Sequence, residues 1–196
     1  MSGRITSAEA TVRVVGGKYK GKALNPPSSN AIRPTSDRLR EAVFNILEHS
    51  YGDPVTGARV LDLFAGTGAL GIEALSRGAR SALFVDEGLE ARGLIRRNLE
   101  SLGIMGLARI SKRDVAHLGP ANAQGGFTLA FADPPYNKGL GGKALSALLH
   151  GKWLSGNALI VLEEAKGAEI AVPEGFELLE ARTYGDTQVT FLRLSP

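Results

Sequence analysis

Short apolar runs recur along the chain and are separated by amphipathic or glycine-rich stretches. The runs at residues 59–64, 81–86, 108–111, 127–132 and 158–163 have the length and composition of β-strands. Helical patterns lie between most of these runs, and strands that alternate with helices usually pair in parallel. The pattern therefore predicts an α/β fold built on a mostly parallel sheet.

Helices are predicted where apolar side chains repeat with a helical period. Leu39, Val43 and Leu47 mark one such face, and Thr35 or Ser36 can cap the helix that carries it. This helix precedes the first strand, whereas the others connect strands. The connecting helices are expected at residues 72–77, 89–102 and 143–149.

Two β-hairpins are predicted, one near each end of the chain. Residues 176–184 and 188–194 flank a Gly-Asp-Thr turn, and these two strands bring the sheet to seven. Residues 12–15 and 18–24 flank two glycines and predict a smaller hairpin that extends the fold at its N-terminus.

The basic residues are unevenly distributed. The 196 residues carry a net charge of +3, but the first 40 hold eight basic and two acidic side chains, a net charge of +6. Lys18, Lys20 and Lys22 alternate, so in a strand they would share one face and suit phosphate contacts. We expect residues 1–30 to form a basic hairpin and linker on a domain of residues 31–196. The alternatives are a solvated surface, or an edge hairpin that lysines protect from aggregation.

Composition excludes several kinds of site. The chain has no cysteine, which excludes disulfides, thiolate metal sites and a cysteine nucleophile. Its three histidines lack metal-ligand spacing, so no metal site is expected. No apolar run approaches 18 residues, and the N-terminus lacks the apolar segment of a signal peptide. We expect a cytoplasmic protein without a membrane span.

A glycine-rich turn after the first long strand indicates a cofactor site. Gly66, Gly68 and Gly71 match the dinucleotide pattern G-x-G-x-x-G. However, Asp62 lies where it would repel a pyrophosphate and attract a cation. The pattern D-x-F-x-G-x-G is typical of the loop that binds S-adenosylmethionine in class I methyltransferases, a ligand with an amino group and a sulfonium. The loop residues are Asp62, Phe64, Ala65, Gly66, Thr67 and Gly68.

Two further aspartates follow predicted strands. Asp86 ends the second strand, where such folds place the carboxylate that binds ribose hydroxyls. Asp114 ends the third strand and is followed by Val115, at the place where such folds contact the adenine amino group. An aspartate at a strand end is also a common turn former, so both interpretations of Asp114 stay open.

The fourth strand ends in Asp133-Pro134-Pro135-Tyr136. The Asp133 carboxylate and the Pro134 carbonyl can each accept an N–H of one exocyclic amine and favour its rehybridisation for methyl transfer. Tyr136 offers a ring on which a flipped base can stack, and the two prolines stiffen the loop. A rigid surface turn is the alternative, and the upstream cofactor loop argues against it.

With these motifs, nearly the whole chain resembles the RsmD-type 16S rRNA guanine-N2 methyltransferases. The resemblance extends to residues 13–21 and to residues 33–38 with Phe44 and Asn45, which look specific to this family. The family often has an acidic residue two positions after the ribose-binding one, and this chain has Gly88 there. Residues 33–45 are expected to close over the cofactor or the target nucleotide.

The resemblance implies a Rossmann-like, S-adenosylmethionine-dependent enzyme that methylates guanine N2 in 16S ribosomal RNA. It implies that residues 62–68, Asp86 and Asp114 with the Val115 amide bind the cofactor, and that residues 133–136 hold the guanine. A monomer acting on ribosomal RNA or on a small-subunit assembly intermediate is expected. The expected RNA contacts are Arg13, Lys18, Lys20, Lys22 and Arg33.

Three alternative functions remain open, in falling order. A DNA adenine-N6 methyltransferase also uses Asp-Pro-Pro-Tyr but normally has an added target-recognition region. A protein glutamine methyltransferase more typically has Asn at position 133 and has less use for aligned lysines. A non-enzymatic RNA-binding protein would not need an intact cofactor loop.

Overall fold

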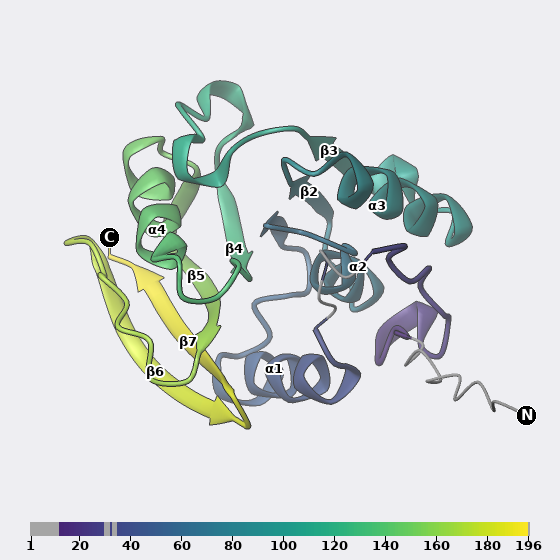
Figure 1. The fold of residues 1–196 in the computed structure, drawn as a ribbon, viewed down its shortest axis with the longest axis horizontal. Coiled ribbons are helices and arrows are strands. Elements are labelled where there is room, and N and C mark those ends of the chain that lie inside the picture. The colour runs from purple at the N-terminus through teal and green to yellow at the C-terminus, as the bar shows by residue number, and fades with distance from the viewer. Residues whose placement is uncertain (1–11, 30–31, 33–34, 196) are drawn as a thin grey trace, which may run out of the picture.

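Seven strands form one sheet in the order β3-β2-β1-β4-β5-β7-β6 in the computed structural model, which describes residues 12–29, 32 and 35–195 (Figure 1). The first five strands are parallel, and β7 pairs antiparallel with both β5 and β6. The predicted α/β class and seven-stranded, mostly parallel sheet are confirmed. The strands are β1 (Arg59–Leu63), β2 (Ser81–Val85), β3 (Ala108–Ser111), β4 (Phe127–Ala132), β5 (Leu154–Ala165), β6 (Phe176–Tyr184) and β7 (Thr187–Leu194).

Apolar side chains cover both faces of the sheet because alternate strand residues point in opposite directions. In β4, Leu129 and Phe131 join the core cluster that contains residues of the first three helices, whereas Ala130 and Ala132 join the cluster under the fourth. No helix in the described ranges is long and apolar enough to cross a membrane. The helices are α1 (Asp37–Ser50), α2 (Ala69–Ser76), α3 (Leu89–Ser101) and α4 (Leu140–His150), and the 3-10 turns are η1 (Gly17–Tyr19), η2 (Met105–Leu107), η3 (Val115–His117) and η4 (Asn122–Gln124).

The sheet reverses its strand order between β1 and β4, which lie side by side. The connections that leave these two strands therefore diverge to opposite faces, and a crevice forms at their carboxyl ends. The ends of β2 and β5 flank the same crevice. The cofactor loop and the 133–136 corner, which are far apart in the sequence, meet there.

The N-terminal hairpin differs from the prediction. Only Arg13 and Ala23 form an antiparallel bridge, and residues 17–19 form the turn η1 instead of a strand. The reason is the close approach of Gly17, which has φ +72° and whose added Cβ would lie 2.0 Å from the Ser76 carbonyl oxygen. The glycines pack the chain onto the end of α2, so the expectation that Lys18, Lys20 and Lys22 share a strand face is wrong.

The start of α1 holds an arginine that the helical pattern had placed away from the core. Ser36 is the N-cap of this helix, one of the two residues predicted for that position. Arg40 is fully buried, and its guanidinium donates to the Thr35 carbonyl at 3.0 Å, to Asp37 Oδ1 at 2.6 Å and to the Arg13 carbonyl. Arg40 thus ties the beginning of α1 to the N-terminal hairpin.

Candidate active site

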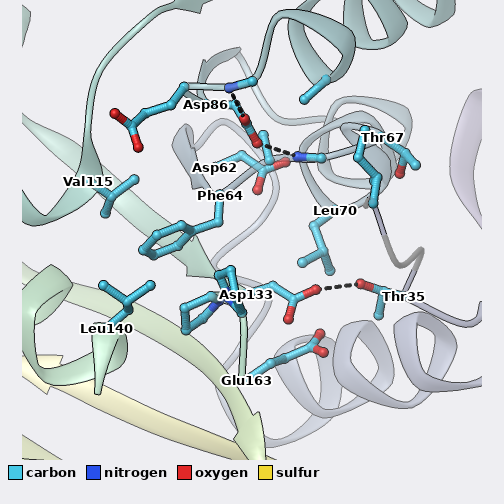
Figure 2. Close-up of a pocket in the computed structure, with 18 of the residues that line it drawn as sticks. Thr35, Asp62, Phe64, Thr67, Leu70, Asp86, Val115, Asp133, Leu140 and Glu163 are labelled. Carbon is cyan, nitrogen blue, oxygen red and sulfur yellow. Dashed lines mark hydrogen bonds between the residues drawn. The ribbon is translucent and has the colours of Figure 1, made fainter. Parts of the chain in front are cut away.

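One cavity of about 990 Å³ lies at the crevice between the ends of β1 and β4 (Figure 2). It receives the cofactor loop from one side and the 133–136 corner from the other. Gly68 is the exception among the predicted cofactor and catalytic residues, because it caps α2 behind the loop with φ +77°. The predicted residues that line the cavity are Asp62, Phe64, Ala65, Gly66, Thr67, Asp86, Asp114, Val115, Asp133, Pro134, Pro135 and Tyr136.

Asp62 brings a buried carboxylate to the cavity wall. It is 2% exposed, and its Oδ2 accepts a hydrogen bond of 2.9 Å from the Gly71 amide in the first turn of α2. Burial raises the pKa of Asp62 well above its usual value, the Gly71 amide opposes the rise, and the charges of Asp133 and Asp86 add to it. A cation beside Asp62 would therefore be strongly favoured.

Asp86 is fixed by the backbone of two loops. Its Oδ2 accepts from the Gly66 amide at 3.0 Å, and its Oδ1 accepts from the Gly88 amide at 2.7 Å (Figure 2). The carboxylate therefore stands between the cofactor loop and the start of α3. Gly88, which replaces the second acidic residue of the family pattern, contributes its backbone to this arrangement.

Asp114 forms a turn as well as lining the cavity. It caps η3 by accepting from the Ala116 amide at 2.8 Å, and its Oδ2 lies 2.5 Å from His117 Nδ1. The hydrogen bond from His117 lowers the pKa of Asp114, and the Ala116 amide adds to the effect. The neighbouring Val115 is 2% exposed and closes the same end of the cavity.

The catalytic corner is held by residues from distant elements. Asp133 directly follows β4, and Thr35 Oγ1 donates to its Oδ2 at 3.1 Å (Figure 2). The Tyr136 hydroxyl lies 2.9 Å from Thr187 Oγ1, the first residue of β7. Pro134 is buried beneath the loop. The carboxylate and the ring are therefore fixed before any substrate enters.

The segment that precedes α1 is attached to the cofactor end of the cavity through α3. Asn98 is fully buried, accepts from the Asn25 amide at 2.7 Å and donates to the Thr67 carbonyl at 3.0 Å. Glu90, at the start of α3, accepts from the amides and hydroxyls of Ser28 and Ser29 at 2.6–3.1 Å. The pKa of Glu90 is lowered to about 2, mainly because the hydroxyls of Ser29 and Ser28 donate hydrogen bonds to its carboxylate.

Four of the five predicted RNA-contacting residues lie outside the cavity. Arg13, Lys18, Lys20 and Lys22 are exposed, and none of them lines its wall, while Arg33 falls outside the described residues. The loop that carries the lysines packs on the C-terminal end of α2, opposite the cofactor loop. Its contacts are two hydrogen bonds of Ser76 Oγ, to the Gly16 carbonyl at 2.6 Å and from the Tyr19 amide at 2.9 Å, and one of 2.8 Å from the Val15 amide to Glu73.

Sequence reasoning missed cavity residues that only the fold brings there. Lys138 lies in the loop before α4 and Lys143 within that helix, whereas Glu163 belongs to the carboxyl end of β5 and Thr187 to the start of β7. One signal could have identified Glu163: it ends the predicted strand 158–163, and the carboxyl ends of parallel strands meet at the edge of the sheet where the recognised site lies. The missed residues of the cavity wall include Lys138, Lys143, Glu163 and Thr187, whereas Thr35 belongs to the block of residues 33–45 expected to close over the cofactor or the target nucleotide.

Comparison with known proteins gives consistent matches over most of the chain. The family model described as conserved hypothetical protein 95 matches residues 12–193. Ribosomal RNA small subunit methyltransferase D of Haemophilus influenzae is 33% identical over 181 residues, which cover 91% of this chain and 92% of that protein.

Solved structures show the same fold. A putative methyltransferase from Escherichia coli superposes with a TM-score of 0.80 at 29% identity and covers 95% of this chain and 99% of its own. An RNA methyltransferase from Salinibacter ruber, solved in complex with S-adenosyl-L-homocysteine, has a TM-score of 0.62 at 15% identity over 83% of this chain and 94% of its own. The second likeness concerns the fold alone.

Proposed function

Because this chain belongs to the RsmD family, described as conserved hypothetical protein 95, we propose that it methylates guanine N2 in small-subunit ribosomal RNA. S-adenosylmethionine is the proposed methyl donor. The observation that carries the proposal is the shared cavity, which places the Asp133 corner beside the Asp62 and Asp86 loops. A methyl donor bound by the cofactor loops and a guanine amine bound at the Asp133 corner would lie side by side in this cavity.

The residues at the cofactor end fit S-adenosylmethionine. Three carboxylates from strand ends, Asp62, Asp86 and Asp114, face a wall that also contains Phe64 and Val115. Such a surface suits a ligand with an ammonium, a sulfonium, ribose hydroxyls and an apolar ring system, and it disfavours a pyrophosphate. When bound, the cofactor supplies an electrophilic methyl group.

The residues at the other end would prepare the acceptor. Asp133 accepts one N–H of the guanine amine, the Pro134 carbonyl accepts the other, and the nitrogen lone pair is thereby freed from the ring. Tyr136, tethered to Thr187, supports the ring of the flipped base. Holding both reactants in line supplies most of the rate enhancement.

Two basic regions support an RNA substrate. Lys138 and Lys143 lie at the rim of the cavity, and both are exposed. The loop with Lys18, Lys20 and Lys22 lies at the end of α2 that is remote from the cofactor loop, and the eight residues of this helix span about 12 Å. An RNA that contacts both regions must present a folded surface and not a single nucleotide.

The test uses small ribosomal subunits from a strain that lacks the orthologous enzyme. The subunits are incubated with the protein and radiolabelled S-adenosylmethionine, and the nucleosides are analysed by mass spectrometry. We expect N2-methylguanosine in the RNA, and its formation should be at least about 10²-fold slower with Asp133→Ala. Label in adenine of naked DNA, or in glutamine of a protein, with none in ribosomal RNA, would overturn the proposal.

A further inference from the structure

Asp133 and Glu163 lie side by side, Asp133 directly after β4 and Glu163 near the end of the neighbouring strand β5. Ala132 of β4 is in register with Leu162 of β5, so Asp133 and Glu163 are the next residues on two parallel strands. Such strands lie about 4.8 Å apart, and residues at the same level point to the same face. Figure 2 shows both carboxylates directed into the part of the cavity that also contains Thr35.

The position of Glu163 is unusual for a carboxylate. The residue is 2% exposed and belongs to a strand that is apolar on both faces from residue 158 to residue 162. Burying a carboxylate next to another one opposes folding, and such pairs are concentrated at sites that use their charge. Glu164 is equally buried but does not line the cavity.

We propose that Glu163 selects the base by accepting a hydrogen bond from guanine N1–H while Asp133 holds the N2 amine, an inference that rests on the proposed function. Guanine presents N1–H and the N2 amine side by side on its Watson–Crick edge. Two carboxylates on adjacent strand ends match these two donors. Enzymes that flip a base read it through this edge.

The same carboxylate would reject adenine. Adenine N1 carries a lone pair in place of a hydrogen, so its edge would set an acceptor against the Glu163 carboxylate. A site built to bind an N–H discriminates strongly against an analogue that lacks it, because the hydrogen bond to that N–H cannot form. Glu163 thus gives the site the base preference that the 133–136 corner lacks.

The test replaces the methylated guanine, once mapped, with 2,6-diaminopurine by ligating a synthetic oligonucleotide into the RNA. This base keeps the amine at C2 but has a lone pair at N1. We expect the wild-type enzyme to prefer guanine by about 100-fold in kcat/KM, the upper end of the usual cost of losing one buried hydrogen bond. Equilibrium binding of the two RNAs in the presence of S-adenosylhomocysteine gives a readout independent of turnover and should show the same preference.

Variants separate base selection from folding. Glu163→Gln should reduce the preference to less than about tenfold, because its amide can donate to N1 of 2,6-diaminopurine. Glu163→Asp keeps the charge and should retain the preference, and Glu164→Gln is the matched control. Thermal unfolding and S-adenosylhomocysteine binding identify any variant that fails to fold. If Glu163→Gln does not fold, the guanine to 2,6-diaminopurine ratios of the wild-type enzyme and of Glu163→Asp test the role of Glu163.

The outcomes distinguish this inference from the function on which it rests. Equal use of the two bases by the wild-type enzyme, or an unchanged ratio in folded Glu163→Gln, would overturn the role of Glu163 and leave guanine methylation intact. Absence of methyl transfer to the guanine RNA itself would overturn the proposed function and this inference with it.

Discussion

The hydroxyl of Tyr136 lies 2.9 Å from Thr187 Oγ1, which joins the loop after β4 to the first residue of β7. The contact spans 51 residues of sequence and reaches past β5, which lies between β4 and β7 in the sheet. It fixes the orientation of the only aromatic ring in the 133–136 corner.

Thr187→Val should lower kcat/KM for RNA by about 2- to 10-fold, as expected for one hydrogen bond of about 0.5–1.5 kcal/mol. The affinity for S-adenosylhomocysteine should not change. Tyr136→Phe removes the same bond from the other side, so the double variant should be no worse than either single variant. Additive losses in this double-mutant cycle would show that the two residues act separately.

Asp133→Ala should lower kcat by at least about 10²- to 10³-fold, the usual cost of removing one group that stabilises developing charge. Calorimetric titration with S-adenosylhomocysteine should give nearly the wild-type affinity, because Asp133 lies at the acceptor end. Normal turnover in this variant would remove Asp133 from its assigned role.

Asp62→Asn should stabilise the cofactor-free protein, and more so at pH 8 than at pH 4. The pKa of Asp62 is raised, so the folded protein holds the proton more tightly than the unfolded chain. The stability from the protonated carboxyl is therefore present at low pH and is lost as the pH rises above the ordinary value of 3.8. Urea unfolding at both pH values measures the difference, and an equal gain at both would refute the assignment. Cofactor affinity should fall in the same variant.

Replacing Lys18, Lys20 and Lys22 with Ala should weaken RNA binding and flatten its salt dependence. Each lost phosphate contact removes about 0.7 from the slope of log K against log salt for single strands. Lys152 and Lys166 are also exposed, and their replacement by Ala is the control. If the slope of the triple variant matches that of the control, the lysine loop is a solvated surface.

Glu73→Ala should destabilise the protein by about 3 kcal/mol, because it breaks a buried pair. Glu73 is 1% exposed, and it accepts from Arg77 Nε at 2.8 Å and from the Val15 amide at 2.8 Å. Glu48 lies 4.0 Å from the same arginine but is 54% exposed, so Glu48→Ala should cost less than about 1 kcal/mol. Denaturant unfolding of both variants makes the comparison, and similar losses would contradict it.

The sequence was most informative where a site is made of neighbouring residues. Asp62, Gly66 and Gly68 belong to one strand-loop-helix unit, so their arrangement followed from local pattern. Glu163 and Thr187 reach the cavity only through strand order and register, which are set by long-range packing. The alternation of Lys18, Lys20 and Lys22 predicted a strand that does not form. The close contact of Gly17 with Ser76 overrides strand propensity, and this contact cannot be predicted from the neighbouring sequence.

The side-chain amide of Asn98 makes hydrogen bonds to two segments of the chain. It donates to the Thr67 carbonyl of the cofactor loop, and it accepts from the backbone amide of Asn25, in the segment that follows the lysine loop. Any RNA contact that shifts this segment must also alter the loop. Thermodynamic linkage then works in both directions: the factor by which RNA changes the affinity for the cofactor equals the factor by which the cofactor changes the affinity for RNA. An enzyme built in this way would couple the binding of its two substrates through one buried side chain.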